Sequence, residues 1–299
     1  MLKYSDQHSR YLFRLLTKKT LLYTEMVHAN AVLKGDAKAL LTFEKNQPPI
    51  ALQLAGSDPI QLGKATAKVT KYNYTEINLN VGCPSKRVQA GDFGVSLFAK
   101  PTLVAEIVSQ MLENSKDIPI SVKTRLGIDE LNTYDDLTHF IEVVSAVGCK
   151  KFIIHARFAK LKNLSPRQNR TQLALDYPRV WKLKQDFPGL EIIINGDIIS
   201  IAQIKEQLTK LDGVMIGRAA FYNPYLLSRF DQIFFSGQNH PLSREEIVDQ
   251  YLEYARKEAA KGTSLNWLLR PLMGIYKGEN NAKFWRKKIG KLAKIGLDF

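Results

Sequence analysis

The sequence predicts a parallel α/β fold followed by a smaller, all-helical C-terminal domain. Short β-rich runs alternate with helix-length segments through most of the 299 residues. Several of these runs are almost entirely apolar, as expected for strands that are covered on both faces. After about Asn239 the β-rich runs stop, and only amphipathic helical segments follow. Repeated β–α units of this length are typical of a parallel sheet.

Seven runs are predicted strands, and helix-length segments separate them. The strands are Leu21–Val27, Ile50–Leu54, Glu76–Asn80, Ile118–Thr124, Lys151–His155, Glu191–Asn195 and Gly213–Ile216. The predicted helices are Ser5–Leu16, Pro59–Thr70, Thr102–Asn114, Tyr134–Val147, Tyr177–Asp186 and Ile201–Leu211. A TIM (β/α)8 barrel needs eight strands. The sequence therefore predicts a TIM barrel that lacks its first strand, whose place would be upstream of Met1. Such an open barrel would expose unpaired backbone, so we expect poor solubility or weak cofactor binding.

The last part of the chain reads as a separate helical domain. Ser243 followed by Glu246 is a capping-box pattern that begins a helix ending near Lys261. Two more helices are predicted over Leu265–Tyr276 and Asn281–Ile295. We expect a catalytic barrel over residues 1–236 and a helical domain over residues 242–299, joined by a linker that contains Gly237 and Pro241.

The charge balance points to a polyanionic partner. The chain has 43 Lys and Arg against 29 Asp and Glu, a net charge of +14. A protein this basic commonly meets nucleic acid, although charge for solubility alone is the alternative. We expect no membrane span and no secretory signal, because no apolar run is long enough. Two cysteines suit a reducing cytoplasm, and we expect a monomer there.

Polar residues recur where the predicted strands end. The functional groups of a barrel enzyme lie at the carboxyl ends of its strands, and a packed core alone would not require polar groups there. Asn195-Gly196-Asp197 taken alone is more often an ordinary turn, but together with Gly217 and Arg218 about twenty residues on it favours a phosphate site. The polar strand-end residues are Gln53, Asn80, Lys123, Arg125, His155, Arg157, Asn195, Asp197 and Arg218.

Cys83 is the candidate catalytic residue. It lies in a Gly-Cys-Pro turn at a strand end. The sequence nearby contains no histidine or other base that would deprotonate the thiol to a thiolate. A proton donor is therefore preferred over a nucleophile. Cys149 is expected to be buried and inert. His155 could be a satisfied core histidine, but its strand-end position favours the pocket, and Lys123 in a buried strand needs an anion. No cluster has the spacing of a metal site, so we expect no metal.

These motifs resemble a known family. Leu79–Pro84, together with Val122–Arg125 and Ile154–Arg157, resembles the tRNA-dihydrouridine synthases. The longer run His155–Arg170 and the segment Leu175–Val180 are similar to the bacterial DusA subfamily. The resemblance extends over essentially the whole chain, tail included.

The resemblance implies a TIM barrel that holds FMN and a helical domain that binds tRNA. It implies that NADPH reduces the flavin, that hydride passes to C6 of a uracil, and that a cysteine, here Cys83, protonates C5. Positions 20 and 20a of the D-loop are the expected targets. The implied FMN contacts are Met1, Leu2, Gln53, Lys123, His155, Asn195, Gly196, Asp197, Gly217 and Arg218. The expected tRNA contacts are Asn80, Arg157, Gln168, Arg270, Arg286 and Lys287.

Asp197 departs from the pattern of the family, in which a glycine is common at this position. The change is tolerable only if the backbone of Asp197, and not its carboxylate, meets the phosphate. The tail after Tyr276 has seven Lys or Arg against two acidic residues, and a solvated helix face is the alternative to phosphate contact beside Phe284 and Trp285. Two other functions stay open: reduction of a small pyrimidine such as dihydroorotate, and a tRNA-binding protein that has lost FMN.

Overall fold

The computed structural model describes residues 3–162, 164–237 and 241–296. The chain forms two compact units. The sheet unit comprises Met26–Thr42 and Ile50–Ile216. The helical unit comprises the chain up to Glu25, residues Phe43–Pro49, and the chain from Gly217 onward. The expected domain boundary between residues 236 and 242 stays a prediction.

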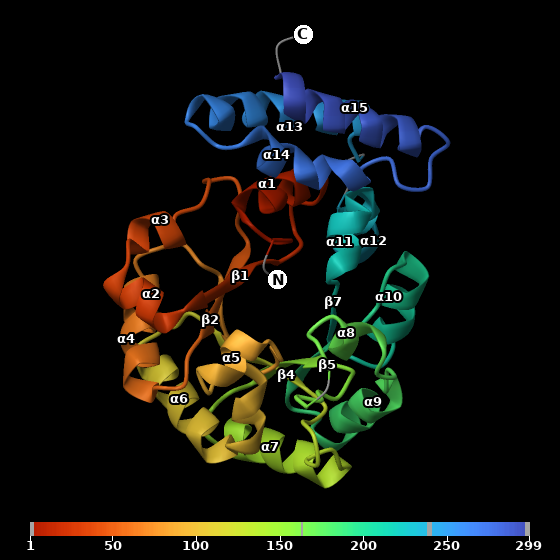
Figure 1. Cartoon of the computed structure of the whole chain (residues 1–299). Coiled ribbons are helices and arrows are strands. Elements are labelled where there is room, and N and C mark those ends of the chain that lie inside the picture. The colour runs from red at the N-terminus through yellow and green to blue at the C-terminus, as the bar shows by residue number, and fades with distance from the viewer. Residues whose placement is uncertain (1–2, 163, 238–240, 297–299) are drawn as a thin grey trace. The chain divides into compact units, whose positions relative to one another are not determined.

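The sheet has seven strands in chain order, counted over the described residues. Figure 1 labels β1, β2, β4, β5 and β7 among them. Each pairing from β2 to β7 is parallel. The predicted α/β fold is confirmed, and most strand bounds agree with the prediction to within two residues. The strands are β1 (Leu22–His28), β2 (Ile50–Ala55), β3 (Glu76–Asn80), β4 (Ile120–Arg125), β5 (Lys151–His155), β6 (Glu191–Asn195) and β7 (Gly213–Met215).

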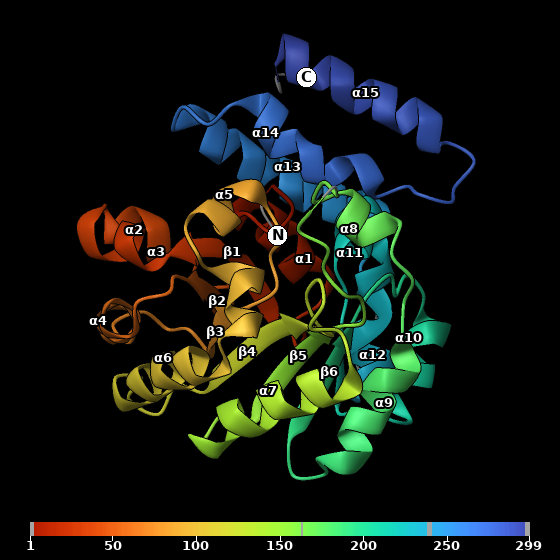
Figure 2. The same cartoon turned by 60° about the horizontal axis from the view of Figure 1, so that its bottom comes forward.

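Helices cover the outer face of this curled sheet, as Figure 2 shows for α6 and α7. Local signals start them: Asp58, Asp176 and Ser200 each accept a hydrogen bond from a first-turn amide, and Thr133 forms a capping box with Asp136. The main helices are α4 (Pro59–Val69), α6 (Pro101–Glu113), α7 (Tyr134–Ala146), α9 (Tyr177–Asp186) and α10 (Ile201–Leu208). Shorter ones are α2 (Ala29–Lys34), α3 (Ala37–Leu41), α5 (Lys86–Ala90), η1 (Gly94–Ala99) and α8 (Gln168–Thr171).

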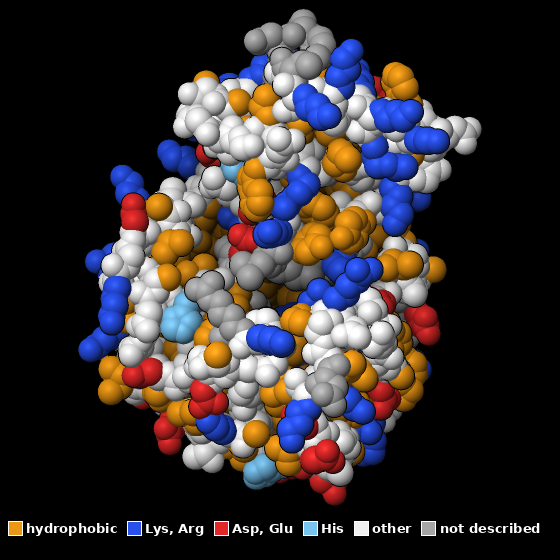
Figure 3. Space-filling view, in the orientation of Figure 1, with side chains coloured by type: hydrophobic (Ala, Val, Ile, Leu, Met, Phe, Trp, Pro, Cys, Tyr) orange, Lys and Arg blue, Asp and Glu red, His pale blue; other side chains and the backbone are white. Residues whose placement is uncertain are grey.

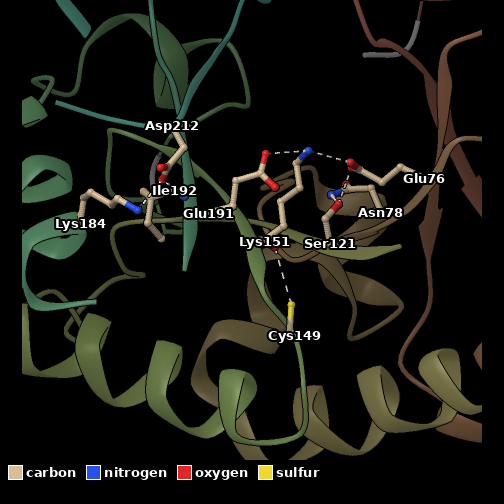
Figure 4. Close-up of polar contacts among 9 residues, drawn as sticks. All are labelled: Glu76, Asn78, Ser121, Cys149, Lys151, Lys184, Glu191, Ile192 and Asp212. Atoms are coloured by element: carbon tan, nitrogen blue, oxygen red, sulfur yellow. Dashed lines mark hydrogen bonds and ion pairs between the residues drawn. The ribbon is translucent and has the colours of Figure 1, made fainter. Parts of the chain in front are cut away.

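The amino ends of the strands are joined by ion pairs (Figure 4). Lys151 Nζ lies 3.0 Å from Glu76 Oε2 and 3.0 Å from Glu191 Oε1. These carboxylates raise the pKa of Lys151 although burial opposes them. A buried Glu76 is tolerable only because it is paired in this way. This end of the sheet therefore has a structural role, opposite the strand ends that carry the predicted site.

The two end strands differ from the inner ones. All residues of β2 and β3 are buried, whereas β7 is half-buried throughout and β1 is half-buried over most of its length. The sheet order begins at β1 and ends at β7. Over the described residues, the count of seven strands agrees with the prediction.

In the helical unit, the N-terminal helix packs with the C-terminal ones. Helix α1 (Gln7–Leu16) contacts η2, α13 and η3. The predicted helix over residues 265–276 is α14 (Leu265–Leu269) followed by η3 (Arg270–Gly274), because Pro271 has no N–H to continue the helix. The capping box of Ser243 and Glu246 is present. The other elements are α11 (Arg218–Tyr222), η2 (Pro224–Arg229), α12 (Phe230–Phe234), α13 (Arg244–Ala260) and α15 (Ala282–Ile295).

Candidate active site

Cys83 lies on a loop whose backbone is held in place on both sides. The side-chain oxygen of Asn80 accepts hydrogen bonds from the amides of Gly82 (3.2 Å) and Cys83 (3.0 Å). The Cys83 carbonyl accepts one from the amide of Val95 at 3.2 Å. Gly94 has φ +65°, and a Cβ there would lie 2.9 Å from the Cys83 carbonyl oxygen. The loop therefore needs a glycine at this point in order to close over Cys83.

The two cysteines have different surroundings. Cys83 is half-buried, whereas Cys149 is only 1% exposed. Burial raises the pKa of Cys149 to about 12, and its sulfur lies 3.6 Å from the Lys151 carbonyl (Figure 4). Cys149 is buried as expected. Cys83 is the cysteine that solvent or a substrate can reach.

Lys123 and His155 come together with Asn195 at the carboxyl ends of β4, β5 and β6. The strand registers align Arg125 with His155 and His155 with Asn195. Lys123 Nζ donates to the side-chain oxygen of Asn195 at 3.0 Å. Burial first, and then the neighbouring Arg125, lower the pKa of Lys123 to about 7, while Cys83 acts in the opposite direction. The positive charge of Arg125 beside Lys123 makes the site suited to an anion.

His155 adds a polar group without a partner. Burial and the charges of Arg125, Lys123 and Arg157 hold its pKa well below the ordinary value, so the ring is neutral. Within the described part of the chain, neither its buried Nδ1 nor the buried Nη1 of Arg157 has a hydrogen-bond partner. Buried polar atoms normally have partners. These atoms therefore fit an anionic, heteroatom-rich group such as a flavin nucleotide.

The carboxylate of Asp197 is bound by an arginine. Its Oδ2 lies 2.7 Å from Arg157 Nη2, and Arg157 Nε donates to the Leu173 carbonyl at 2.7 Å. Gly196 precedes it with φ +140°, and a Cβ there would lie 2.7 Å from Leu175 Cδ2. Arg157 thus compensates the negative charge of Asp197 within the sheet unit, which reduces the repulsion that the carboxylate would exert on a phosphate near its backbone.

The other predicted cofactor contacts belong to different parts of the chain. Gln53 is buried on β2 and accepts a hydrogen bond from Asn80 at 2.8 Å. Gly217 and Arg218 belong to the helical unit, where Arg218 is the first residue of α11. Met1 and Leu2 lie outside the described residues. All of these stay predicted FMN contacts.

The predicted tRNA residues fall into two groups. Arg286 and Lys287 on α15 are exposed. Gln168 instead accepts from the Ser165 amide at 2.8 Å. Arg270 lies 3.1 Å from the Asp6 carboxylate, with its guanidinium 4.3 Å from the ring centre of Trp267. For these four residues, and for the predicted contacts Asn80 and Arg157 described above, a tRNA contact stays a prediction.

One expectation for the tail is wrong. Trp285 is not exposed beside the tail cations as expected, because the residue is only 8% exposed and its N–H donates to the Leu272 carbonyl at 2.7 Å. Its neighbour Phe284 is 70% exposed. The helical period places these adjacent residues on different faces of α15.

Arg125 is one of the polar strand-end residues noted in the sequence, but it is not among the predicted FMN or tRNA contacts. It is 3% exposed, and it donates to the carbonyls of Gly82 (2.9 Å), Phe158 (2.9 Å) and Asn169 (3.2 Å). It therefore ties the Cys83 loop to the loops that follow β5. The cost of burying an arginine at the end of an apolar strand is the sequence signal that identifies such a residue.

Two other features are absent from the part of the chain that the structure describes. No helix there is long and apolar enough to cross a membrane. Among the same residues, no group of three His, Cys, Asp or Glu side chains could hold a metal ion.

Solved structures share the fold of the chain. Morphinone reductase in complex with tetrahydroNAD matches with a TM-score of 0.53 at 12% identity, over 80% of this chain and 84% of that one. A 2-naphthoyl-CoA reductase matches with a TM-score of 0.56 at 10% identity, over 77% of this chain and 48% of that one. At such identity the likeness concerns the fold alone.

Sequence comparisons identify much nearer relatives. The tRNA-dihydrouridine(20/20a) synthase of Synechocystis sp. is 46% identical over 97% of this chain and 86% of its own length. The synthase of the same name from Vibrio parahaemolyticus is 47% identical, over 98% of this chain and 90% of its own length. The family model of the dihydrouridine synthases matches residues 1–295. The chain belongs to the dihydrouridine synthase family.

Proposed function

We propose that this chain reduces uridine to 5,6-dihydrouridine in tRNA, at positions 20 and 20a of the D-loop, with FMN as cofactor and NADPH as reductant. The observation that carries the proposal is a reachable thiol on a fixed loop beside a buried, electropositive cluster with polar atoms that lack partners. The names of the relatives supply the positions.

The residues that would hold FMN in the sheet unit are Gln53, Lys123, His155 and Asn195, with the backbone of Gly196 and Asp197; Gly217 and Arg218 are the further predicted contacts. Bound FMN would supply the hydride. A charged Lys123 would stabilise negative charge on the cofactor, because burial strengthens the attraction between them. Neutral His155 offers Nδ1 as a hydrogen-bonding group.

Cys83 would supply the proton. A half-buried thiol on a fixed loop can donate a proton to C5 of the uracil while C6 accepts the hydride. The base must leave the folded RNA to reach this point, since a nucleobase inside a stack is inaccessible to such chemistry.

The helical unit would bind the tRNA backbone. Lys and Arg side chains gather over α15 (Figure 3), and the exposed ones include Arg286 and Lys287. Cations on a folded surface attract phosphates over long distances. A small substrate would not need such a surface, which argues against the small-pyrimidine alternative. The proposal includes a cytoplasmic, monomeric enzyme.

The test is to incubate the purified chain with NADPH, FMN and tRNA that lacks dihydrouridine, and to locate dihydrouridine by mass spectrometry of tRNA fragments. We expect the product at positions 20 and 20a, and none with the Cys83→Ala variant in the same time. Reduction of a free pyrimidine but not of tRNA would favour the small-molecule alternative. A purified protein that binds tRNA but takes up no flavin would favour the other alternative, a tRNA-binding protein that has lost FMN.

A further inference from the structure

A chain of hydrogen bonds runs through the interior of the sheet unit from the amino ends of the strands to the Cys83 loop. It starts at the ion pair of Glu76 with Lys151 (Figure 4). Ser121 Oγ donates to Glu76 Oε1 at 2.6 Å, and Asn78 Nδ2 donates to Ser121 Oγ at 2.8 Å. Three strands have contributed a side chain by this point, because Glu76 and Asn78 lie on β3, Ser121 on β4 and Lys151 on β5.

The same chain continues to the loop. Gln53 Nε2 donates to Asn78 Oδ1 at 2.8 Å, and Asn80 Nδ2 donates to Gln53 Oε1 at 2.8 Å. Asn80 Oδ1 then accepts from the amides of Gly82 and Cys83 at 3.2 and 3.0 Å. Glu76, Asn78, Ser121, Gln53 and Asn80 are each at most 8% exposed.

Both ends of the chain impose the same direction on it. The Glu76 carboxylate beside Lys151 can only accept, and the backbone amides of Gly82 and Cys83 can only donate. An amide side chain could otherwise exchange its oxygen and nitrogen by a half-turn. In this chain a half-turn of any one amide would place two donors or two acceptors face to face. The ends therefore fix the orientation of Asn78, Gln53 and Asn80 together.

We propose that this polar chain positions Cys83 for proton donation, and that Ser121, Asn78 and Glu76 are positioning residues that act through Gln53 and Asn80. None of these three residues is assigned a role by the proposed function. The inference rests on the proposed function, because that function makes Cys83 the proton donor. The hydrogen bonds and their direction do not depend on it. Its physical consequence is that a change near the amino ends of the strands alters the Cys83 loop.

The test is the rate at which iodoacetamide alkylates Cys83 in the full-length protein, followed by peptide mass spectrometry. Buried Cys149 is the internal reference for local unfolding. Ser121→Ala removes the link between Asn78 and Glu76 and leaves both with an unmet hydrogen bond. We expect Cys83 to react about three- to tenfold faster, the change that the loss of one hydrogen bond would produce, with no change at Cys149.

Three further variants separate positioning from loss of stability. Tyr74→Phe removes another buried hydroxyl of the sheet unit, which donates to the Leu41 carbonyl at 2.9 Å outside the chain of hydrogen bonds, and should leave Cys83 reactivity unchanged. Ser121→Thr retains the hydroxyl and should restore the wild-type rate. Glu76→Gln keeps the shape of the side chain, but its amide can donate as well as accept a hydrogen bond at this end of the polar chain. We therefore expect Cys83 to be alkylated faster than in the wild type, but by less than in Ser121→Ala. This variant also provides the test if Ser121→Ala does not fold.

Catalysis provides the second readout. With Ser121→Ala we expect about tenfold slower reduction of uridine, while reduction of bound flavin by NADPH is unchanged. Unaltered Cys83 alkylation in both Ser121→Ala and Glu76→Gln would overturn the inference and leave the proposed function standing. Altered alkylation together with full uridine reduction by Cys83→Ala would instead overturn the proton-donor role, while the coupling between the two ends of the polar chain would stand.

Discussion

Lys123 makes flavin binding depend on pH. Its pKa in the protein is about 7, against an ordinary value of 10.5. A bound anion favours the charged lysine and raises this pKa, so binding takes up a proton above about pH 7. We expect flavin affinity to fall by up to about tenfold per pH unit between pH 7 and 9, as measured by quenching of flavin fluorescence. Lys123→Met should bind flavin more weakly and lose this slope; an equal slope in the variant would assign the proton to another group.

The same lysine affects stability without cofactor. The unfolded chain holds more protons than the folded protein between the pKa of about 7 and the ordinary 10.5. The contribution of Lys123 to the free energy of unfolding therefore rises with pH in that window. Urea unfolding at pH 7 and pH 9 should show a larger increase for the wild type than for Lys123→Met. Parallel changes in both proteins would show that the pKa of Lys123 is not lowered in the folded protein.

Cys83→Ala separates the two half-reactions. We expect reduction of flavin by NADPH to continue at the wild-type rate, because this step needs no proton from the thiol. Uridine reduction should slow by ~10²–10⁴-fold, the usual contribution of a general acid. Stopped-flow absorbance of the flavin measures both steps. An equal loss in both would show that Cys83 maintains the structure of the site instead.

At the scale of elements, α15 carries the electrostatic prediction. Its apolar face is buried through Trp285, Ile289 and Leu292, while Arg286 and Lys287 are exposed. Replacing both with Ala should weaken tRNA binding and reduce its salt dependence by about one unit of log–log slope for each phosphate that the protein no longer neutralises. Binding titrations at several salt concentrations measure this. Reduction of flavin is the control, and an unchanged slope would mean that these charges only meet solvent.

Elements are predictable where one local signal determines them. Apolar runs such as Ile192–Ile194 identify covered strands, and Ser243 with Glu246 identifies the start of α13. The short helices α2, α3 and α8 have too few residues to show a helical period of apolar side chains, and they are not predicted. Site residues at strand ends can be anticipated because a polar group there needs a reason. The sequence does not reveal the partner of Asp197 or the hydrogen bonds through Asn78 and Ser121, because these depend on which side chains of neighbouring strands meet.

At the scale of the whole molecule, the ends of the sheet should open first. The end strand β7 is half-buried along its length, whereas β2 and β3 are wholly buried. Hydrogen–deuterium exchange should therefore be faster in β7 and in the half-buried part of β1 than in β2–β5. Equal protection across all seven strands would show that both end strands have partners for their outer edges in solution.

The path of the chain bears on how such an enzyme can be divided or recombined. The chain passes from one unit to the other at Glu25–Met26, Thr42–Phe43, Pro49–Ile50 and Ile216–Gly217. Helix α1 packs with α13, to which it is connected only through the whole intervening sheet. The helical unit is thus no detachable module. A gene cut after residue 236 would leave α1 without part of its apolar cover, so exchange of the C-terminal helices between relatives would have to include residues 1–25 and 43–49 as well.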